Sequence, residues 1–358
     1  MLDPEYLHDL INVARKHNEM VMAALVLNVI DGTENFDNYT EMSVTNEFIS
    51  HKQHEDIRQS LWDIGIETIS YFDEVDFIND FLNNKFSTAK RIIVINFAQK
   101  GIAIGRKSLV PSFCDLNKIW RTGSNAFVVS LCRSKFHSNV ILKSCGLPVA
   151  ECWLYDYRFG WLNDSPPSGL EIIMKLNYES SSIGLNDRNI FCYSKKKDNH
   201  IQMFSESYKQ SVLLEQFVRG YEVEVPVIYI KKEARHKALA PVGIMVSDRE
   251  YIGGEILDYK RRYADDYTFY LFSDFNNLKS EEISKISEEA ARILDIDDLA
   301  RVDFRIDHDM NLHIMDIATS PYLLSESSFE YAFKLYGLNY KHILQAYIGL
   351  AILKNLDT

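Results

Sequence analysis

The first third of the chain alternates between apolar, branched runs and segments with helical spacing. Residues 22–30 and 91–97 are branched, apolar runs typical of buried strands, and residues 67–72 form a shorter one. Residues 46–64 and 76–83 lie between them and carry apolar side chains at helical spacing. Strands that alternate with helices favour a parallel sheet covered by helices. We therefore expect this part of the chain to form a parallel α/β unit.

The pattern changes after about residue 125, where short strands become more frequent. Helices are predicted over residues 125–144, 280–294 and 340–350. Strands are predicted over residues 152–156, 169–175, 186–194, 212–217, 222–230, 299–306 and 312–316. No internal repeat or long low-complexity linker separates these segments. We therefore expect domains that share one cleft rather than independent modules.

Length and charge narrow the class of protein. A chain of 358 residues is too long for one minimal core and suits two or three closely packed domains. Its net charge of −12 argues against a nucleic-acid partner, which would need a basic face. The apolar runs are too short to cross a membrane, and the first residues lack the pattern of a signal peptide. Five cysteines without a Cys-x-x-Cys pair indicate reduced thiols, so we expect a cytoplasmic protein.

A lysine followed by a serine-rich loop is the first candidate binding motif. Lys175 ends a predicted strand, and Ser180, Ser181, Ser182 and Gly184 follow within a few residues. An ammonium group next to backbone amides and hydroxyl groups suits a phosphate ligand. A surface hairpin with an unremarkable lysine explains the same segment about as well. The loop is not a Walker motif.

Acidic residues at strand ends form the second and third motifs. Glu215 closes one predicted strand and Glu222 opens the next, where they could bind ribose hydroxyl groups or an adenine amine, or simply face water. Asp303 and Asp316 lie on two strands joined by a tight turn, which should bring them close together. Paired carboxylates beside phosphates are a usual way to hold Mg²⁺. Solvent-facing strand ends are the alternative.

A polar stretch over residues 247–267 is the fourth motif. It contains Arg262 and Tyr263 and lies beside Gly253-Gly254, as a mobile lid would. An ordinary charged loop would look the same. His51 and His54 lie one helical turn apart, but no third metal ligand accompanies them, so we interpret them as surface histidines.

These segments, in this order, resemble ATP-grasp enzymes of the D-alanine–D-alanine ligase family. Lys175-x-x-x-Glu179-Ser-Ser-Ser resembles the family's serine loop, and Arg301-Val-Asp303 with the run from Asp316 to Pro321 resembles its metal segment. Thr122-Gly-Ser124 followed by Lys135 resembles the approach to its first nucleotide lysine. The resemblance implies an ATP-grasp fold of mixed α/β (α+β) class. Its expected parts are an N-terminal parallel α/β domain (residues 1–122), a small central domain (123–214) and a C-terminal domain (215–358), with ATP between the last two.

The resemblance also implies a reaction and a role for each matched residue. The reaction would be ATP-dependent joining of a carboxylic acid to an amine through an acyl phosphate, with release of ADP and phosphate. The implied roles are phosphate binding by Lys135, Lys175 and Ser182; adenosine binding by Glu215 and Glu222; Ser181 above the reacting groups; a lid with Arg262 and Tyr263; contact of Arg301 with the anionic intermediate; Mg²⁺ held by Asp303 and Asp316; and Ser327 facing the carboxylate of the second substrate.

Two departures from the family pattern shape the expected substrate. Ala318 stands where the metal segment usually has asparagine, and it offers no metal ligand. Gly105-Arg106-Lys107 replaces a Gly-Glu-Asp stretch beside the first D-alanine, so Arg106 is expected to favour an anionic acid over D-alanine. This pattern predicts an amide or peptide ligase of specialised metabolism. The alternative is a degenerate ATP-grasp protein that binds nucleotide and regulates or scaffolds. A homodimer through residues 46–64 is a further expectation.

Overall fold

Three sheets organise the chain. The computed structural model describes residues 2–30, 48–86, 88–101, 103–257, 267–321, 323 and 325–356. The N-terminal sheet is parallel, with strand order β4-β1-β5-β6. Its strands are β1 (Val21–Val26), β4 (Glu67–Tyr71), β5 (Arg91–Asn96) and β6 (Trp120–Arg121), and its helices are α1 (Pro4–Lys16), α3 (His51–Trp62), α4 (Glu74–Leu82) and α5 (Leu109–Leu116). The short strands β2 (Val29–Ile30) and β3 (Ile49–Ser50) pair beside it. The expected parallel α/β unit is confirmed.

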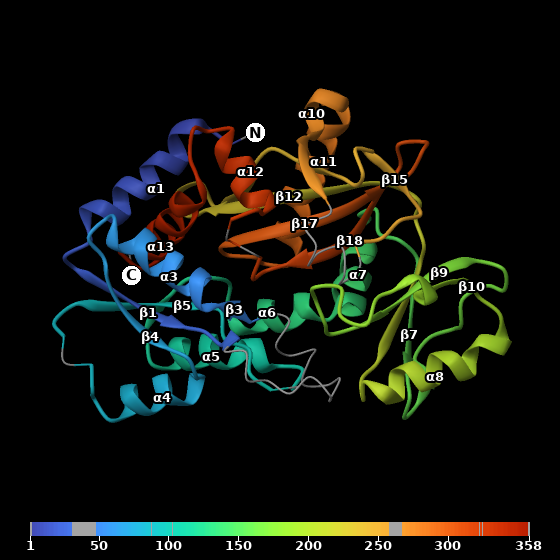
Figure 1. Ribbon diagram of the computed structural model, residues 1–358, viewed down its shortest axis with the longest axis horizontal. Helices are drawn as coiled ribbons and strands as arrows, with labels where there is room; N and C mark the ends of the chain where they lie inside the picture. Colours follow the sequence, from blue (N-terminus) through green and yellow to red (C-terminus); the bar gives the residue numbers. More distant parts are fainter. Residues whose placement is uncertain are drawn as a thin grey trace.

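The central sheet is antiparallel and forms the green lobe of Figure 1. Its strands run in the order β10-β9-β11-β7-β8. They are β7 (Cys152–Asp156), β8 (Gly160–Trp161), β9 (Glu171–Leu176), β10 (Ile190–Cys192) and β11 (Val212–Gln216). Helix α8 (Asp198–Ser207) covers one face, because Ile201 is fully buried in the same core as Ile172 and Val212.

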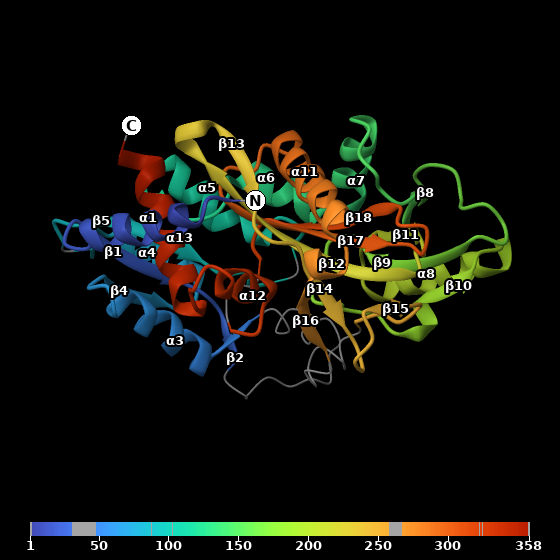
Figure 2. The same cartoon turned by 90° about the horizontal axis from the view of Figure 1, so that it is seen from above.

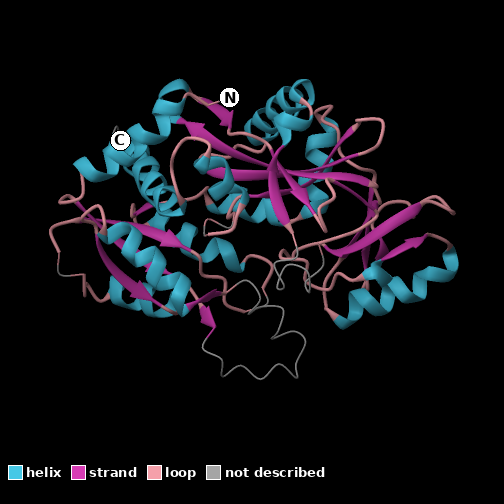
Figure 3. Cartoon of the chain, turned by 45° about the horizontal axis from the view of Figure 1, so that its top comes forward, coloured by secondary structure: helices cyan, strands magenta, loops and turns pink. Residues whose placement is uncertain are grey.

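The large sheet contains seven strands and is also antiparallel. Its strands are β12 (Gly220–Ile230), β13 (Arg235–Ala238), β14 (Val242–Met245), β15 (Tyr251–Gly253), β16 (Thr268–Leu271), β17 (Leu299–Ile306) and β18 (Leu312–Ala318). Helices α6 (Ala126–Arg133), α7 (Lys135–Ser144) and α11 (Asn277–Ile293) contribute to its core, and α10 (Phe272–Phe275) precedes α11. Figure 3 shows these strands in magenta with the cyan helices packed along them. Gly220 is needed at the start of β12, since an added Cβ would lie 1.8 Å from the Ile306 carbonyl oxygen.

The core of the N-terminal sheet is completed by helix α13 (Tyr340–Leu356). Ile343, Leu344 and Ile348 of this helix are fully buried in one cluster with Leu7 and Leu10 of α1. Figure 1 and Figure 2 both show α13 lying beside α1. Helix α12 (Ser328–Lys334) adds Phe329 and Phe333 to this cluster. Segments from the two ends of the described chain therefore share one core.

Several predicted elements differ from the structure in their bounds. The helix predicted from residue 46 begins at His51, because Ser50 and Gln53 form a capping box; residues 46 and 47 lie outside the described residues. The strand predicted over 186–194 is a 3₁₀ turn, Asp187–Asn189, followed by β10. Helices α1, α5, α8 and α12 and strands β13 to β16 were not predicted. The domain divisions after residues 122 and 214 stay predictions, although the second falls inside β11.

The helix predicted over residues 125–144 is two helices, α6 and α7, separated at Ser134. Ser134 has extended backbone angles and belongs to neither helix. Asn177 holds this break: its Oδ1 accepts from the Phe136 amide at 2.9 Å, and its amide group donates to Ser134 Oγ at 3.1 Å. Because Asn177 follows Lys175 by two residues, this contact fixes the start of α7, where Lys135 lies, beside the end of β9.

Candidate active site

Three carboxylates form a row across neighbouring strands of the large sheet. Glu224 on β12 lies opposite Asp303 on β17, and Asp303 lies opposite Asp316 on β18. Residues opposite each other in an antiparallel sheet direct their side chains to the same face. All three line one cavity of about 650 Å³. The predicted proximity of Asp303 and Asp316 is confirmed, and Glu224 extends the row.

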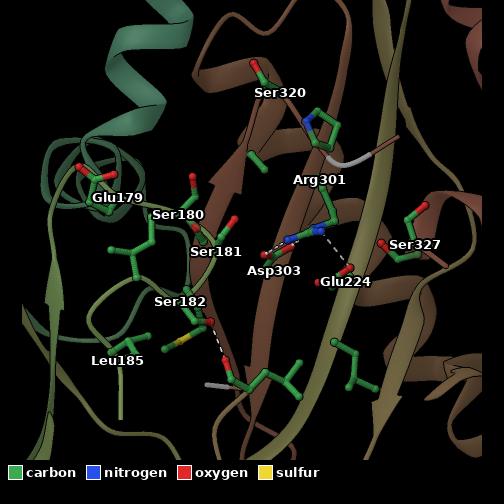
Figure 4. A pocket seen from close by; sticks show the side chains of 18 of the residues that line it. Glu179, Ser180, Ser181, Ser182, Leu185, Glu224, Arg301, Asp303, Ser320 and Ser327 are labelled. Atoms are coloured by element: carbon green, nitrogen blue, oxygen red, sulfur yellow. Dashed lines mark hydrogen bonds and ion pairs between the residues drawn. The ribbon is translucent and has the colours of Figure 1, made fainter. Parts of the chain in front are cut away.

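Arg301 lies between two of these acids. Its Nε and Nη2 donate to the two carboxylate oxygens of Asp303 at 2.7 Å each, and Nη1 lies 3.1 Å from Glu224 Oε2. Figure 4 shows the guanidinium between them. Burial alone would lower the pKa of Arg301, but Asp303 and Glu224 outweigh it and raise that pKa, so Arg301 stays charged. Burial raises the pKa of Asp303 to about 6 in spite of Arg301.

The two predicted phosphate lysines each contact an acid. Lys135, the first residue of α7, places Nζ 2.8 Å from Asp316 Oδ2. Lys175 on β9 places Nζ 2.6 Å from Glu215 Oε1. Burial alone would raise the pKa of Asp316, but Lys135 lowers it below its ordinary value. Burial raises the pKa of Glu215, against the effect of Lys175.

The serine loop, residues 180–184, faces this cluster. Ser181 and Ser182 both have left-handed backbone angles, with φ of 55°. Each such residue costs on the order of 1 kcal/mol or more, so the surrounding structure must hold it. Ser182 Oγ donates to the Leu257 carbonyl at 2.5 Å. Figure 4 shows Ser180 and Ser181 beside Arg301 and Asp303, and all four line the cavity.

Most predicted site residues meet in this cavity. Those that line it are Lys135, Lys175, Ser181, Ser182, Glu222, Arg301, Asp303, Asp316 and Ser327. The wall also contains apolar side chains, Ile173, Leu185, Phe217, Val218 and Ile256, and all of these except Val218 pack in one cluster. Ser327 caps α12 by accepting from the Glu330 amide at 3.2 Å.

Two predicted residues lie outside the cavity wall, and two more lie outside the described part of the chain. Glu215 is fully buried behind Lys175 and is absent from the cavity wall. Arg106 also lies outside the wall; its Nη2 donates to Glu179 Oε2 at 2.8 Å, whereas its neighbour Lys107 lines the cavity. Arg262 and Tyr263 of the predicted lid lie outside the described residues. His51 and His54, interpreted as surface histidines, each contact the Phe72 ring in an edge-to-face arrangement.

The sequence interpretation gave no role to three charged residues of the site. Glu224 binds Arg301, Arg305 binds Glu222 at 2.8 Å, and Glu179 opens the serine loop. Glu222 and Glu224 are two residues apart on a strand, which places both on one face. That spacing could have identified Glu224. The pairing of Arg305 required the register of β12 with β17.

The described residues provide an incomplete set of metal ligands. Within that part of the chain, no three His, Cys, Asp or Glu side chains are grouped so that they could hold a metal ion by themselves. Asp303 and Asp316 are two carboxylates, and Ala318 adds no oxygen ligand from its side chain.

Among the described residues, no helix is long and apolar enough to span a membrane.

Comparisons with known proteins show to which family the chain belongs. The family described as "D-ala D-ala ligase C-terminus" matches residues 142–349, more than half of the chain. The D-alanine–D-alanine ligase of Bordetella avium is 26% identical over 251 residues, covering 70% of this chain and 75% of that protein. D-alanine–D-alanine ligase B of Clostridium perfringens is 22% identical over 284 residues, covering 77% of this chain and 87% of that protein.

A solved structure gives the same architecture. The crystal structure of D-alanine–D-alanine ligase from Bacillus anthracis complexed with ATP aligns with a TM-score of 0.65 at 15% identity, covering 93% of this chain and 98% of that one. At this identity the likeness concerns the fold, which includes a parallel N-terminal sheet and antiparallel sheets in the rest of the chain. The chain therefore has the ATP-grasp fold and belongs to the D-alanine–D-alanine ligase family of ATP-dependent, ADP-forming C–N ligases.

Proposed function

We propose that this ligase joins an anionic carboxylic acid, other than D-alanine, to an amine at the expense of ATP, and that it acts in specialised metabolism. The observation that carries the proposal is the convergence of Lys135, Lys175, Arg301 and the serine loop on one cavity that also contains paired carboxylates. Its partners would be small molecules. The homodimer expected from the sequence stays a prediction.

The cavity has the chemistry that ATP requires. The apolar cluster of Ile173, Phe217 and Ile256 in its wall suits a purine ring, and Glu222, which also lines the cavity, would accept from ribose hydroxyl groups. Lys135 and Lys175 would then bind phosphate oxygens. Both lysines contact acids in this structure, so nucleotide phosphates would compete with Asp316 and Glu215 for them.

Asp303 and Asp316 fit one Mg²⁺ that reaches the site with the nucleotide. Two carboxylates leave most of an octahedral shell to phosphate oxygens and water, which is how Mg²⁺ is usually bound beside phosphates. Such an ion would neutralise charge on the phosphate that is transferred. Arg301 donates one hydrogen bond to each oxygen of Asp303, and each oxygen keeps a second lone pair with which it would bind the ion.

The residues support two successive substitutions. In the first, a carboxylate oxygen of the acid attacks the γ-phosphorus of ATP, the bond to the ADP oxygen breaks, and an acyl phosphate forms. In the second, the amine nitrogen attacks the acyl carbon, the carbon–oxygen bond to phosphate breaks, and the nitrogen loses a proton. Lys135, Lys175 and Arg301 would stabilise the negative charge in both steps, and the serine loop would position the reacting groups.

The N-terminal wall supports the choice of an anionic acid. Lys107 lines the cavity where the family pattern has an acid, so this wall should repel an ammonium group and attract a carboxylate. Arg106, also expected here, donates to Glu179 instead. Lys107 is the basic residue of this stretch that lines the cavity.

A screen of acids against amines, read by release of ADP and phosphate, tests the function. With Mg²⁺ and ATP, we expect ADP release for dicarboxylic or other anionic acids and little or none for D-alanine. AMP and pyrophosphate as products would contradict the acyl phosphate route. No turnover across the panel, together with tight ATP binding, would instead favour the degenerate nucleotide-binding protein that Ala318 suggests.

Replacing Ala318 tests the metal site. Ala318→Asn restores an oxygen ligand two residues from Asp316 and should strengthen Mg²⁺ binding in the presence of ATP by about fivefold, since one further ligand adds on the order of 1 kcal/mol. Magnesium titration of nucleotide turnover measures the change. Ala318→Val adds bulk without a ligand and serves as the control. Equal magnesium affinities in all three proteins would mean that another group fills this position.

A further inference from the structure

Glu179 connects the serine loop to two other parts of the molecule. It immediately precedes Ser180, and its side chain is only 7% exposed. Arg106 Nη2 donates to Glu179 Oε2 at 2.8 Å, and Arg133 Nη2 donates to the same oxygen at 3.3 Å. Gln210 Nε2 donates to Oε1 at 3.1 Å. Both carboxylate oxygens of Glu179 therefore have partners.

The two arginines come from different segments. Arg106 lies in a 3₁₀ turn (Arg106–Ser108) that leads into α5 beside the N-terminal sheet, and Arg133 ends α6. Their side chains are 3% and 6% exposed, so the contacts are shielded from water. A buried charge is retained only when it is paired, and here two guanidinium groups meet one carboxylate. The pairing of Arg106 with Glu179 joins residues 73 positions apart in sequence.

The serine loop needs such a contact because of its backbone. Ser181 and Ser182 are consecutive non-glycine residues in the left-handed region. Surrounding contacts must hold residues in that region, since they are sparsely populated otherwise. Glu179 is fixed before these two residues, and Ser182 is fixed to Leu257 at the other end of the pair. Arg106 and Arg133 thus hold the beginning of the strained segment.

We propose that Arg106 and Arg133 are positioning residues that set the place of the serine loop through Glu179. The N-terminal sheet then controls the phosphate-binding loop through a buried ion pair. Arg106 stands where the family pattern has an acid, so this pair belongs to this chain rather than to that pattern. The effect that substitutions of Arg106 or Glu179 should have on turnover rests on the proposed function. Their effect on the position of the serine loop does not.

Hydrogen exchange of the nucleotide-free protein tests the loop directly. In Arg106→Gln and in Glu179→Gln, amides of residues 180–185 should exchange about tenfold faster, because the loop opens locally more often. Arg106→Lys keeps a cation and should retain most of the protection. Arg121→Gln is the matched control: it removes a partly buried ion pair with Asp115 in the same region without touching the serine loop.

Kinetics provide the second readout. If Arg106 acts through the loop, Arg106→Gln lowers kcat for every active acid by a similar factor and leaves the ratio of KM values between charged and neutral acids unchanged. Double-variant analysis should show that Arg106→Gln and Glu179→Gln together cost no more than Glu179→Gln alone. Unchanged exchange in residues 180–185 would overturn the proposal. A KM increase confined to anionic acids would also overturn it, because Arg106 would then contact the substrate.

Discussion

Replacing Lys175 with alanine is expected to lower ATP turnover by about a thousandfold, in the range seen when one preorganised charge-stabilising donor is removed. Lys175 lines the cavity, and its ammonium is the partner of a carboxylate that is fully buried. The substitution therefore removes a phosphate ligand and also leaves Glu215 without its cation. Turnover is measured as ADP release under saturating ATP and Mg²⁺.

Destabilisation by the unpaired Glu215 must be separated from the loss of the phosphate ligand. Loss of one member of a buried ion pair can cost about 3–5 kcal/mol of stability. The double variant Lys175→Ala with Glu215→Gln removes the unpaired charge, so it should melt closer to the parent protein while turnover stays low. Lys237→Ala is the control for loss of a lysine elsewhere. It removes the ion pair between Lys237 on β13 and Glu288 on α11. Turnover within tenfold of the parent in the double variant would exclude Lys175 from the site.

Arg301→Lys is the second substitution with a large expected effect. The planar guanidinium reaches both oxygens of Asp303 and also Glu224, and a single ammonium cannot reproduce this geometry. We expect kcat to fall by about a hundredfold to a thousandfold, since a positioned donor to the developing negative charge is lost. Single-turnover measurement of ADP formation would place the loss in the chemical step.

Glu224→Gln separates the contribution of the second acid. It keeps the shape of the side chain but weakens its hold on Arg301, so its effect on kcat should be smaller than that of Arg301→Lys. Arg292→Lys changes an exposed arginine paired with Glu289 and should leave kcat unchanged. A kcat near that of the parent in Arg301→Lys would show that charge alone, without the fork geometry, is sufficient.

Local pattern was enough to find residues on the strands that line the cavity. Lys175 and Asp316 follow buried, branched runs, and the tight turn between β17 and β18 brings Asp303 opposite Asp316. The parallel order of the N-terminal sheet also followed from alternation of strand and helix. These features depend on neighbours in sequence, where hydrophobic periodicity is informative.

Contacts between distant segments could not be found in this way. The partner of Arg106 is 73 residues away in sequence, so the departure from the family pattern suggested a substrate contact where the structure has an ion pair. The break at Ser134 depends on Asn177, which lies on another element. In sequence alone, without the contact from Asn177, residues 125–144 have an unbroken helical pattern. Glu215 was expected at the nucleotide, and only the packing of Lys175 and Asn139 around it shows that it is fully buried.

The packing of α13 against α1 also bears on how the protein folds during synthesis. Leu7 and Leu10 emerge from the ribosome early, but Ile343, Leu344 and Ile348, which cover them, are translated hundreds of residues later. Until then the N-terminal sheet exposes an apolar surface, the kind of surface that chaperones bind and through which nascent chains aggregate. Completion of its core is therefore tied to translation of α13, so premature termination before residue 340 would leave the N-terminal sheet partly uncovered.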